Sequence, residues 1–298
     1  GFAINQNGEL YSWGSGAQYA SGLGTLSDTP SPVRIGTSSN WIRVVTNYRT
    51  TFAFNAANAL YVWGSGQHYV TGLGTTDDIP TPTPFGPPGF YIDISVSNSA
   101  TFAISIHGDL FGWGMKYALG IGELTEEYVQ QPMMINNSVM WLKVKAISGG
   151  GFAITNDGKL YSWGVSEYFR SGQGTQDTIP YPTRVGTRSD WADVWAKGDN
   201  AYAVTTDGTL YSWGHHTYLG RDTQGDEEHG ETPYPIQFMY ASESVCATTH
   251  GGYVISSGAL YFWGTAYSVQ NVEYSKYPQR IGERNDWWKI DDGFAIAR

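Results

Sequence analysis

The sequence contains few charged residues and a single cysteine. Charged side chains make up 15% of its 298 residues, compared with ~25% in typical soluble domains. Because Cys246 stands alone, the chain can form no internal disulfide and no cluster of thiolate metal ligands. No apolar run approaches the ~18 residues that a membrane-spanning helix requires. These absences exclude a disulfide-stapled scaffold and predict no membrane span.

Basic residues are scarcer than acidic ones. The chain has 17 Lys plus Arg against 27 Asp plus Glu, which gives a formal net charge of -10. This charge repels a phosphate backbone, so we expect no direct binding to nucleic acid. Low lysine together with abundant Tyr, Trp, Ser, Thr, Asn and Gly favours an extracellular or virion location over a cytoplasmic one.

Recognisable catalytic motifs are also missing. The sequence has no Gly-x-Ser-x-Gly, no phosphate-binding loop and no carboxylate pair that recurs at a fixed position. The pair His215-His216 and the acidic run 226–228 lie in one segment, but their spacing matches no established metal site. The histidines outside this segment are isolated, at His68, His107 and His250. We therefore expect no enzymatic activity, no cofactor and no metal site.

The main feature that the sequence does have is a repeat. A Trp-Gly pair recurs every 50 residues without drift. The tryptophans are Trp13, Trp63, Trp113, Trp163, Trp213 and Trp263. A fixed period of this length is the signature of a solenoid, propeller or array. No linker interrupts the six units, so we predict one domain over residues 1–298.

Each unit contains a hairpin signal. In the fourth copy two strand-like runs, 151–154 and 160–164, are joined by a turn with Asp157-Gly158. A tight hairpin turn needs a residue with positive φ, which glycine accepts without strain. Most other copies also have glycine there, at Gly8, Gly108, Gly208 and Gly258. The second copy has Asn58, and asparagine tolerates left-handed geometry better than most residues.

Two further strands are predicted after each Trp-Gly pair and its loop of about 18 residues. One begins near a proline, where no ladder bond is lost. These prolines are Pro32, Pro82, Pro132, Pro182, Pro233 and Pro278. The other begins at an aromatic residue, namely Trp41, Tyr91, Trp141, Trp191 or Trp287. Four antiparallel strands repeated six times, with no helical period, predict an all-β fold, a closed β-propeller of six blades.

The two chain ends predict how the ring closes. The segment from Trp287 onward reaches the point in the repeat at which Gly1-Phe2 begins. We predict a closing blade with two strands from the C-terminus, at Pro278 and Trp287, and two from the N-terminus, so that no edge is unpaired. The alternative is seven blades with the seventh incomplete, because residues 293–296 repeat the Gly-Phe-Ala-Ile of residues 1–4.

The unit resembles a known repeat. Leu-Tyr-Ser-Trp-Gly is followed by Gly-Leu-Gly at 22–24 and 72–74, then by Pro-x-x-Val/Ile, and then by an Ala-Ile or Ala-Val strand with an Asp-Gly turn. This order is similar to the regulator of chromosome condensation repeat, over essentially the whole chain. The resemblance implies a rigid disc whose loops grip another macromolecule. That family includes an exchange factor for a small GTPase, plant ultraviolet-B photoreceptors, secreted β-lactamase inhibitory proteins and phage structural proteins.

The chain also departs from that family. The family usually has seven blades and often carries Gly-x-x-His-Thr before the Ala-Ile strand, whereas this chain has Gly149-Gly-Gly151 and Ser97-Asn-Ser99 in that region. The photoreceptor motif Trp-Arg-His-Thr is reduced here to Tyr48-Arg49-Thr50-Thr51. Light sensing therefore has no support, and no residue of the exchange factor can be carried over.

Tyrosines recur in the loops that follow the Trp-Gly pairs. They lie three to five residues after each pair, at Tyr19, Tyr69, Tyr117, Tyr168, Tyr218 and Tyr267. We predict that the six repeat tryptophans are structural and pack between blades. The tyrosines have two interpretations: they cover the Trp-Gly corner and bond a loop carbonyl, or they form a contact surface on one face, since tyrosine is enriched at interfaces.

The same loops are acidic. Their carboxylates are Asp28, Asp77, Asp78, Glu123, Glu126, Glu127, Asp177, Asp226, Glu227 and Glu228. Such a rim favours solubility, and it also fits the steering of a basic partner or weak cation binding.

These observations lead to three functional hypotheses. The first is a non-enzymatic protein-interaction or structural propeller that binds another protein, or copies within a larger assembly, through loops on one face. The alternative is an intracellular regulator of a small GTPase. The third is a glycan-binding propeller that uses exposed aromatic residues.

Overall fold

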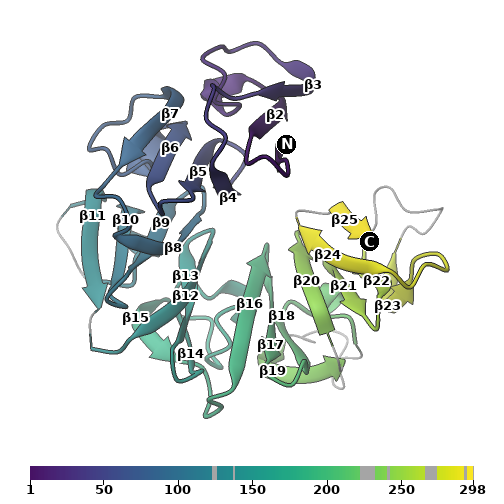
Figure 1. The fold of residues 1–298 in the computed structure, drawn as a ribbon. Helices are drawn as coiled ribbons and strands as arrows, with labels where there is room; N and C mark the ends of the chain where they lie inside the picture. Colours follow the sequence, from purple (N-terminus) through teal and green to yellow (C-terminus); the bar gives the residue numbers. More distant parts are fainter. Residues whose placement is uncertain are drawn as a thin grey trace. The chain divides into compact units, whose positions relative to one another are not determined.

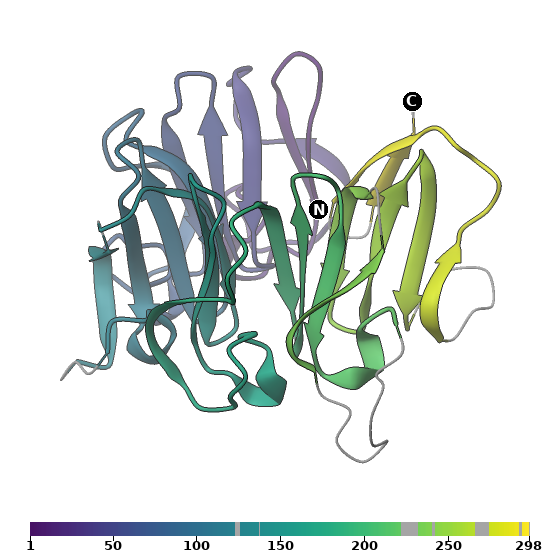
Figure 2. The same ribbon diagram turned by 90° about the horizontal axis from the view of Figure 1, so that it is seen from below.

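The computed structural model describes residues 1–122, 126–136, 138–221, 232–239, 242–265, 274–291 and 294–297. The chain forms two compact units, Gly1–Gly151 and Phe152–Arg298. Both consist mainly of short β-strands (Figure 1), and the only helices among the described residues are single turns of 3-10 helix. The strands of each sheet lie edge to edge (Figure 2) and pair antiparallel.

The strands of the first unit are β1 (Phe2–Ile4), β2 (Leu10–Gly14), β3 (Thr29–Arg34), β4 (Trp41–Thr46), β5 (Thr50–Asn55), β6 (Leu60–Gly64), β7 (Ile79–Phe85), β8 (Tyr91–Val96), β9 (Ala100–Ser105), β10 (Leu110–Met115), β11 (Tyr128–Asn136) and β12 (Trp141–Ile147). The later strands are β13 (Gly150–Thr155), β14 (Leu160–Gly164), β15 (Ile179–Arg184), β16 (Trp191–Lys197), β17 (Asn200–Thr205), β18 (Leu210–Gly214), β19 (Thr232–Met239), β20 (Ser242–Thr248), β21 (Gly251–Ser256), β22 (Ala259–Gly264), β23 (Ser275–Arg280), β24 (Trp287–Asp291) and β25 (Phe294–Ala297). The 3-10 turns are η1 (Ala17–Tyr19), η2 (Gln67–Tyr69), η3 (Lys116–Ala118), η4 (Glu167–Phe169) and η5 (His216–Tyr218).

Most sheets contain four strands in sequence order. They are β4 to β7, β8 to β11, β12 to β15, β16 to β19 and β20 to β23, whereas β1 to β3 form a three-stranded sheet and β24 pairs with β25. Each Trp-Gly strand lies in a different sheet, so six repeats of an antiparallel blade are confirmed. The fold is that of a β-propeller built from four-stranded blades.

One blade, β4 to β7, shows why the repeat folds this way. All six residues of strand β5 are buried, as expected for a strand inside a blade covered on both sides. The pairing of β6 with β7 is interrupted by a bulge between Val62 and Gly64. Gly64 has a φ of 97°, and a Cβ there would lie 2.1 Å from the carbonyl oxygen of Arg49. Glycine is therefore required after the tryptophan, where the chain leaves the blade.

The predicted hairpin turns are confirmed. The turn glycines have positive φ, for example 75° at Gly158, and Asn58 adopts a φ of 53°. A hydrogen bond from the amide of Asn58 to the carbonyl of Asn55, 2.9 Å long, closes its turn. The local signals in the sequence were sufficient because these turns depend on one residue each.

The predicted grouping of strands in the last blade needs correction. Pro278 lies in β23, which pairs with β22 and so completes the blade that begins with β20. The Trp287 strand, β24, pairs with β25, which contains the C-terminal Phe-Ala-Ile. Closure of the ring by a sheet of N- and C-terminal strands is therefore not confirmed. The last strand of each four-stranded blade pairs with the Trp-Gly strand that precedes it in the chain, as β23 pairs with β22.

Five of the repeat tryptophans are buried, at Trp63, Trp113, Trp163, Trp213 and Trp263. Four of these indoles donate a hydrogen bond to the loop of the preceding repeat, namely those of Trp63, Trp113, Trp213 and Trp263. The Nε1 of Trp63 donates to the carbonyl of Ala20 at 3.2 Å, and the Nε1 of Trp113 donates to that of Val70 at 2.8 Å. The tryptophan thus holds the preceding loop in place. Trp13 is only half-buried.

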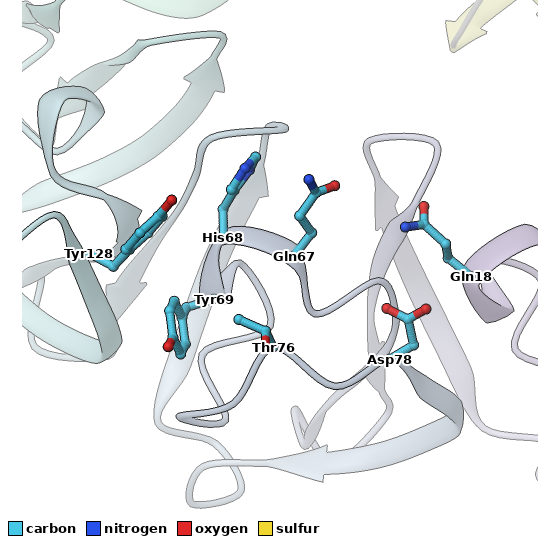
Figure 3. Close-up of a pocket in the computed structure, with 7 residues that line it drawn as sticks. All are labelled: Gln18, Gln67, His68, Tyr69, Thr76, Asp78 and Tyr128. Carbon is cyan, nitrogen blue, oxygen red and sulfur yellow. The ribbon is translucent and has the colours of Figure 1, made fainter.

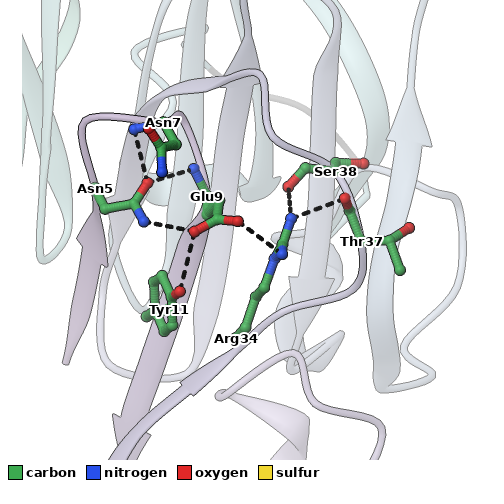
Figure 4. A network of polar contacts seen from close by, with 7 residues as sticks. All are labelled: Asn5, Asn7, Glu9, Tyr11, Arg34, Thr37 and Ser38. Carbon is green, nitrogen blue, oxygen red and sulfur yellow. Dashed lines mark hydrogen bonds and ion pairs between the residues drawn. The ribbon is translucent and has the colours of Figure 1, made fainter.

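An arginine holds the connection between one blade and the next (Figure 4). Arg34, at the end of β3, forms an ion pair with Glu9 at 2.7 Å and donates to the carbonyl oxygens of Thr37 and Ser38. Hydrogen bonds from Asn5 and Tyr11, with help from the Arg34 charge, lower the pKa of Glu9. The pair fixes the connector that leads to Trp41.

Candidate functional site

The loops after the Trp-Gly pairs contain an unusual turn. In η2 both His68 and Tyr69 adopt left-handed φ angles, 58° and 59°, and Gln18 and Tyr19 do the same in η1. The turn of η2 is closed by hydrogen bonds from Tyr69 N to Gly66 O and from Gly72 N to Tyr69 O, 3.0 and 2.9 Å long. Because left-handed geometry is unfavourable for residues with a Cβ, the turn depends on these bonds. It sets the directions in which the side chains project.

Two of the predicted binding acids hold these loops together. Asp78 Oδ1 accepts a hydrogen bond from the amide of Gly66 at 3.1 Å, and Asp28 Oδ1 accepts one from Gly16 at 3.0 Å. A Cβ on Gly66 would lie 2.2 Å from the carbonyl oxygen of Asp77, so only glycine fits there. One oxygen of each carboxylate is therefore committed to the loop.

The first unit has an open hollow of about 480 Å³ beside η2. Its lining residues are Gln18, Gln67, His68, Tyr69, Thr76, Asp78 and Tyr128. Figure 3 shows the heads of Gln18 and Gln67 and the carboxylate of Asp78 on one side of it, with the rings of Tyr69 and Tyr128 on the other. The hollow thus has a polar wall and an aromatic wall.

Tyr128 forms much of the aromatic wall. Its ring lies parallel to that of His68, with 6.1 Å between centroids, and 5.5 Å from the ring of Tyr69. The Nδ1 of His68 lies 3.1 Å from the carbonyl oxygen of Asn98, which orients the imidazole. Desolvation, together with the negative charge of Glu127, raises the pKa of Tyr128.

Tyr48 lies in the turn between β4 and β5, next to the η2 loop. Its φ is 82° and its side chain is 75% exposed. The neighbouring Arg49 accepts a hydrogen bond from Ser65 N through its carbonyl and donates from Nη1 to Gln67 Oε1 at 3.3 Å. At the same position of the repeat, 150 residues later, stands Gly198, with a φ of 63°. Tyrosine thus occupies a backbone conformation that suits glycine.

The predicted binding tyrosines do not share one position in the turn. Tyr19 and Tyr69 occupy its last residue and are half-buried, whereas in η4 this position is Phe169, and Tyr168 stands one residue earlier. Tyr117 and Tyr168 are 52% and 39% exposed.

Tyr218, the last residue of η5, belongs to a cluster of rings in the second unit. Its ring meets that of His250 edge to face, with 5.3 Å between centroids, and its carbonyl accepts the indole N–H of Trp263 at 3.0 Å. Tyr168 meets His215 edge to face at 5.1 Å, and the rings of His215 and His216 stack at 4.4 Å. Tyr267 lies outside the described residues.

The remaining predicted acids are exposed or lie outside the described residues. Glu127 is exposed and uses its backbone carbonyl to accept from the amide of Lys116 at 3.0 Å. Asp177 is exposed and accepts from the hydroxyl of Thr175 at 3.0 Å. The acids that lie outside the described residues are Glu123, Asp226, Glu227 and Glu228.

Several residues of the hollow were not selected from the sequence. Tyr128 stands where Asp28 and Asp78 stand in earlier copies, since Val129 pairs with Gly114 as Ile79 pairs with Gly64. Asp28, Asp78 and Tyr128 are spaced 50 residues apart, so the period of the repeat already places them at one position. A comparison of the copies at this position would have found the match.

The described residues contain neither a metal-binding cluster nor a membrane-spanning helix. No group of three or more His, Cys, Asp or Glu side chains could hold a metal ion there. No helix in the described part of the chain has the length and apolar character of a membrane span.

Comparison with known proteins bears on the fold. Residues 7–54 match the model of the regulator of chromosome condensation (RCC1) repeat. No curated protein sequence matches the chain. The structure is similar to that of human WBSCR16, with a TM-score of 0.79 and 17% identity over 92% of this chain and 79% of the other.

Two yeast structures are also similar. Yeast RCC1 (Prp20) bound to Kap60 gives a TM-score of 0.82 and 18% identity, over 99% of this chain and 76% of the other. Prp20p from Saccharomyces cerevisiae, described with its binding properties to Gsp1p and histones, gives 0.59 and 16%, over 95% and 88%. At these identities the likeness concerns the fold alone.

Proposed function

We propose that this β-propeller, whose residues 7–54 match the RCC1 repeat, is a non-enzymatic binding module that holds another protein through the loop face of its first unit. The observation that carries this proposal is Tyr48, a bulky side chain that is 75% exposed and has a φ of 82°. Residues in strained conformations cluster at functional sites, and tyrosine is enriched at the centres of protein interfaces.

The balance of energies at Tyr48 supports a contact role. Left-handed geometry costs roughly 1 to 2 kcal/mol in a residue with a Cβ, and Gly198 avoids this cost at the same position of the repeat. A ring that is mostly exposed regains little of this energy by packing within the chain. The exposed area of Tyr48 therefore suits contact with a partner.

The test is comparative capture of partners. The protein, its Tyr48→Ala variant and a Tyr181→Ala variant would be immobilised and exposed to extract of the source organism. Tyr181 is also an exposed tyrosine, but it lies in β15. Partners that bind through the loop face are retained by the Tyr181→Ala variant and lost from the Tyr48→Ala variant, and their affinity falls by about tenfold or more when they are purified. Equal capture by all three proteins would refute the proposal.

The alternative of a small-GTPase regulator is separable in the same experiment. Selective enrichment of a nucleotide-free small GTPase, with faster nucleotide release, would support an exchange-factor role, for which Prp20p, described with its binding properties to Gsp1p, is a precedent. The extracellular or virion location is an expectation from composition, and secretion or recovery in particles would test it.

A further inference from the structure

We propose that the hollow beside η2 is a binding site for an uncharged saccharide unit, either free or carried by a glycoprotein. This site is distinct from Tyr48, which does not line the hollow. At about 480 Å³ the hollow lies within the ~300–1,000 Å³ range of small-ligand sites. Its lining combines aromatic rings with several polar heads, as such sites generally do.

The polar wall supplies both donors and acceptors. Gln67 Oε1 accepts from Arg49, so the Gln67 amide nitrogen is left to donate into the hollow. Asp78 uses Oδ1 for the amide of Gly66, so Oδ2 is left to accept. Gln18, on the same side in Figure 3, offers one group of each kind. Neighbouring hydroxyls of a sugar ring both donate and accept, and they match this arrangement.

The charges around the hollow disfavour an ionic ligand. Asp78 would repel an anion, and the guanidinium of Arg49, which donates to Gln67 Oε1 at 3.3 Å, disfavours a cation beside Gln67. A ligand with either charge would therefore meet a like charge on one part of the polar wall or beside it. An uncharged ligand with many hydroxyls avoids both.

The aromatic wall suits the other face of a sugar ring. One face of a pyranose presents C–H groups, which pack on aromatic rings while the hydroxyls point sideways. Tyr128 and Tyr69 are half-buried and lie opposite the polar heads (Figure 3). Tyr128 stands where earlier copies have Asp28 and Asp78, so the aromatic wall exists at this hollow because this copy departs from the repeat.

The loop that lines the hollow is held in one conformation before a ligand binds. Its loop is fixed by the bond between Asp78 and Gly66 and by the hydrogen-bonded left-handed turn at His68 and Tyr69. A rigid site loses little conformational entropy on binding. Among the described lining residues Asp78 is the only carboxylate, whereas glycoside hydrolysis generally uses two, so the site binds sugar and does not cleave it.

The first experiment identifies the ligand class. Saturation-transfer NMR would be recorded on the whole chain with neutral methyl pyranosides of glucose, galactose, mannose and N-acetylglucosamine, and with N-acetylneuraminic acid and glucosamine as charged probes. We expect a signal from at least one neutral sugar, with a Kd of about 1 mM, and none from the charged probes. A glycoprotein with neutral glycans, before and after deglycosylation, distinguishes protein-borne sugar from free sugar.

The second experiment places the sugar in the hollow. Tyr128→Asp introduces the residue that earlier copies have, and Gln18→Ala removes one polar head without touching the loop bonds. Each variant should weaken sugar binding by about tenfold or more, while its thermal midpoint stays near that of the parent. Tyr48→Ala serves as the control and should leave sugar binding unchanged.

The outcomes are separable from those of the protein-binding proposal. Loss of sugar binding in Tyr128→Asp and Gln18→Ala, with retention in Tyr48→Ala, supports the saccharide site whether or not a protein partner is found. Silence of every neutral sugar with the parent protein would overturn the site. Binding that is unaffected by Tyr128→Asp, or preference for a charged probe, would overturn it as well.

Discussion

Replacing Tyr48 by glycine should make the protein more stable while it weakens partner binding. The φ of 82° at Tyr48 costs roughly 1 to 2 kcal/mol in a residue with a Cβ. Glycine removes that strain, but its greater freedom in the unfolded chain offsets about 0.5 to 1 kcal/mol. Little packing is lost, because the ring is 75% exposed. The net gain is about 0.5 to 1 kcal/mol.

Thermal and urea unfolding of three proteins would measure this gain. In a large domain 1 kcal/mol shifts the midpoint by about 2 to 4 °C, so Tyr48→Gly should melt about 1 to 3 °C above the parent. Tyr48→Ala is the matched variant, since it loses the ring but keeps the strained backbone. It should lie within about 0.5 kcal/mol of the parent, and both variants should lose partner binding equally.

The comparison of glycine with alanine can refute the reasoning. If Tyr48→Gly is no more stable than Tyr48→Ala, the backbone at this position stores no strain, and the energetic argument for a functional tyrosine fails. If both variants bind partners as well as the parent, the strain exists but does not serve binding through this ring.

Three further predictions concern the scaffold. Trp113→Ala should lower the free energy of unfolding by about 3 to 5 kcal/mol, because its indole is buried, whereas Trp288→Ala, at a 46% exposed tryptophan, should change it by less than about 1 kcal/mol; equal urea midpoints would contradict the assigned core. Gly66→Ala should disorder the η2 loop, because its Cβ would meet the Asp77 carbonyl at 2.2 Å, and limited proteolysis should then cut that loop first. Hydrogen bonds from the threonines beside it lower the pKa of Asp207 to about 2, below its unfolded value of ~3.9. The stability that ionised Asp207 gives the folded protein is therefore complete above pH 4 and is lost as the pH falls through about 2. Asp207→Asn should lose less thermal stability than the parent between pH 5 and pH 2.5.

The parts of the fold that depend on local chemistry were predictable. Gly158 and Asn58 mark turns that a single residue permits, and the strands on either side follow from them. The grouping of strands into blades was less so. Pro278 is close in sequence to Trp287, which favoured one blade for both, but the ladder joins β23 to β22 across a long loop. Sequence proximity does not reveal such pairing, because a loop of this length leaves several partners within reach.

The candidate site was predictable only in part. Tyr69 and Asp78 were selected from recurrence in the loops, and both line the hollow. Recurrence could not reveal that one carboxylate oxygen of Asp78 accepts a hydrogen bond from its own loop, since that depends on the folded position of Gly66. Tyr128 and Tyr48 were missed because their importance lies in departures from the repeat, at positions where other copies have aspartate or glycine.

The hydrogen bonds from four of the buried indoles to the loop of the preceding repeat have a consequence for growth of the array. Trp63 and Trp113 each reach a carbonyl that lies 43 residues earlier in the chain. An inserted copy of 50 residues would bring an indole for the loop before it and a loop carbonyl for the indole after it. Gene duplication in whole units therefore adds a donor and an acceptor together. A duplication of any other length would leave an indole N–H without its loop carbonyl. Such a chain can change its number of units without redesigning any single one.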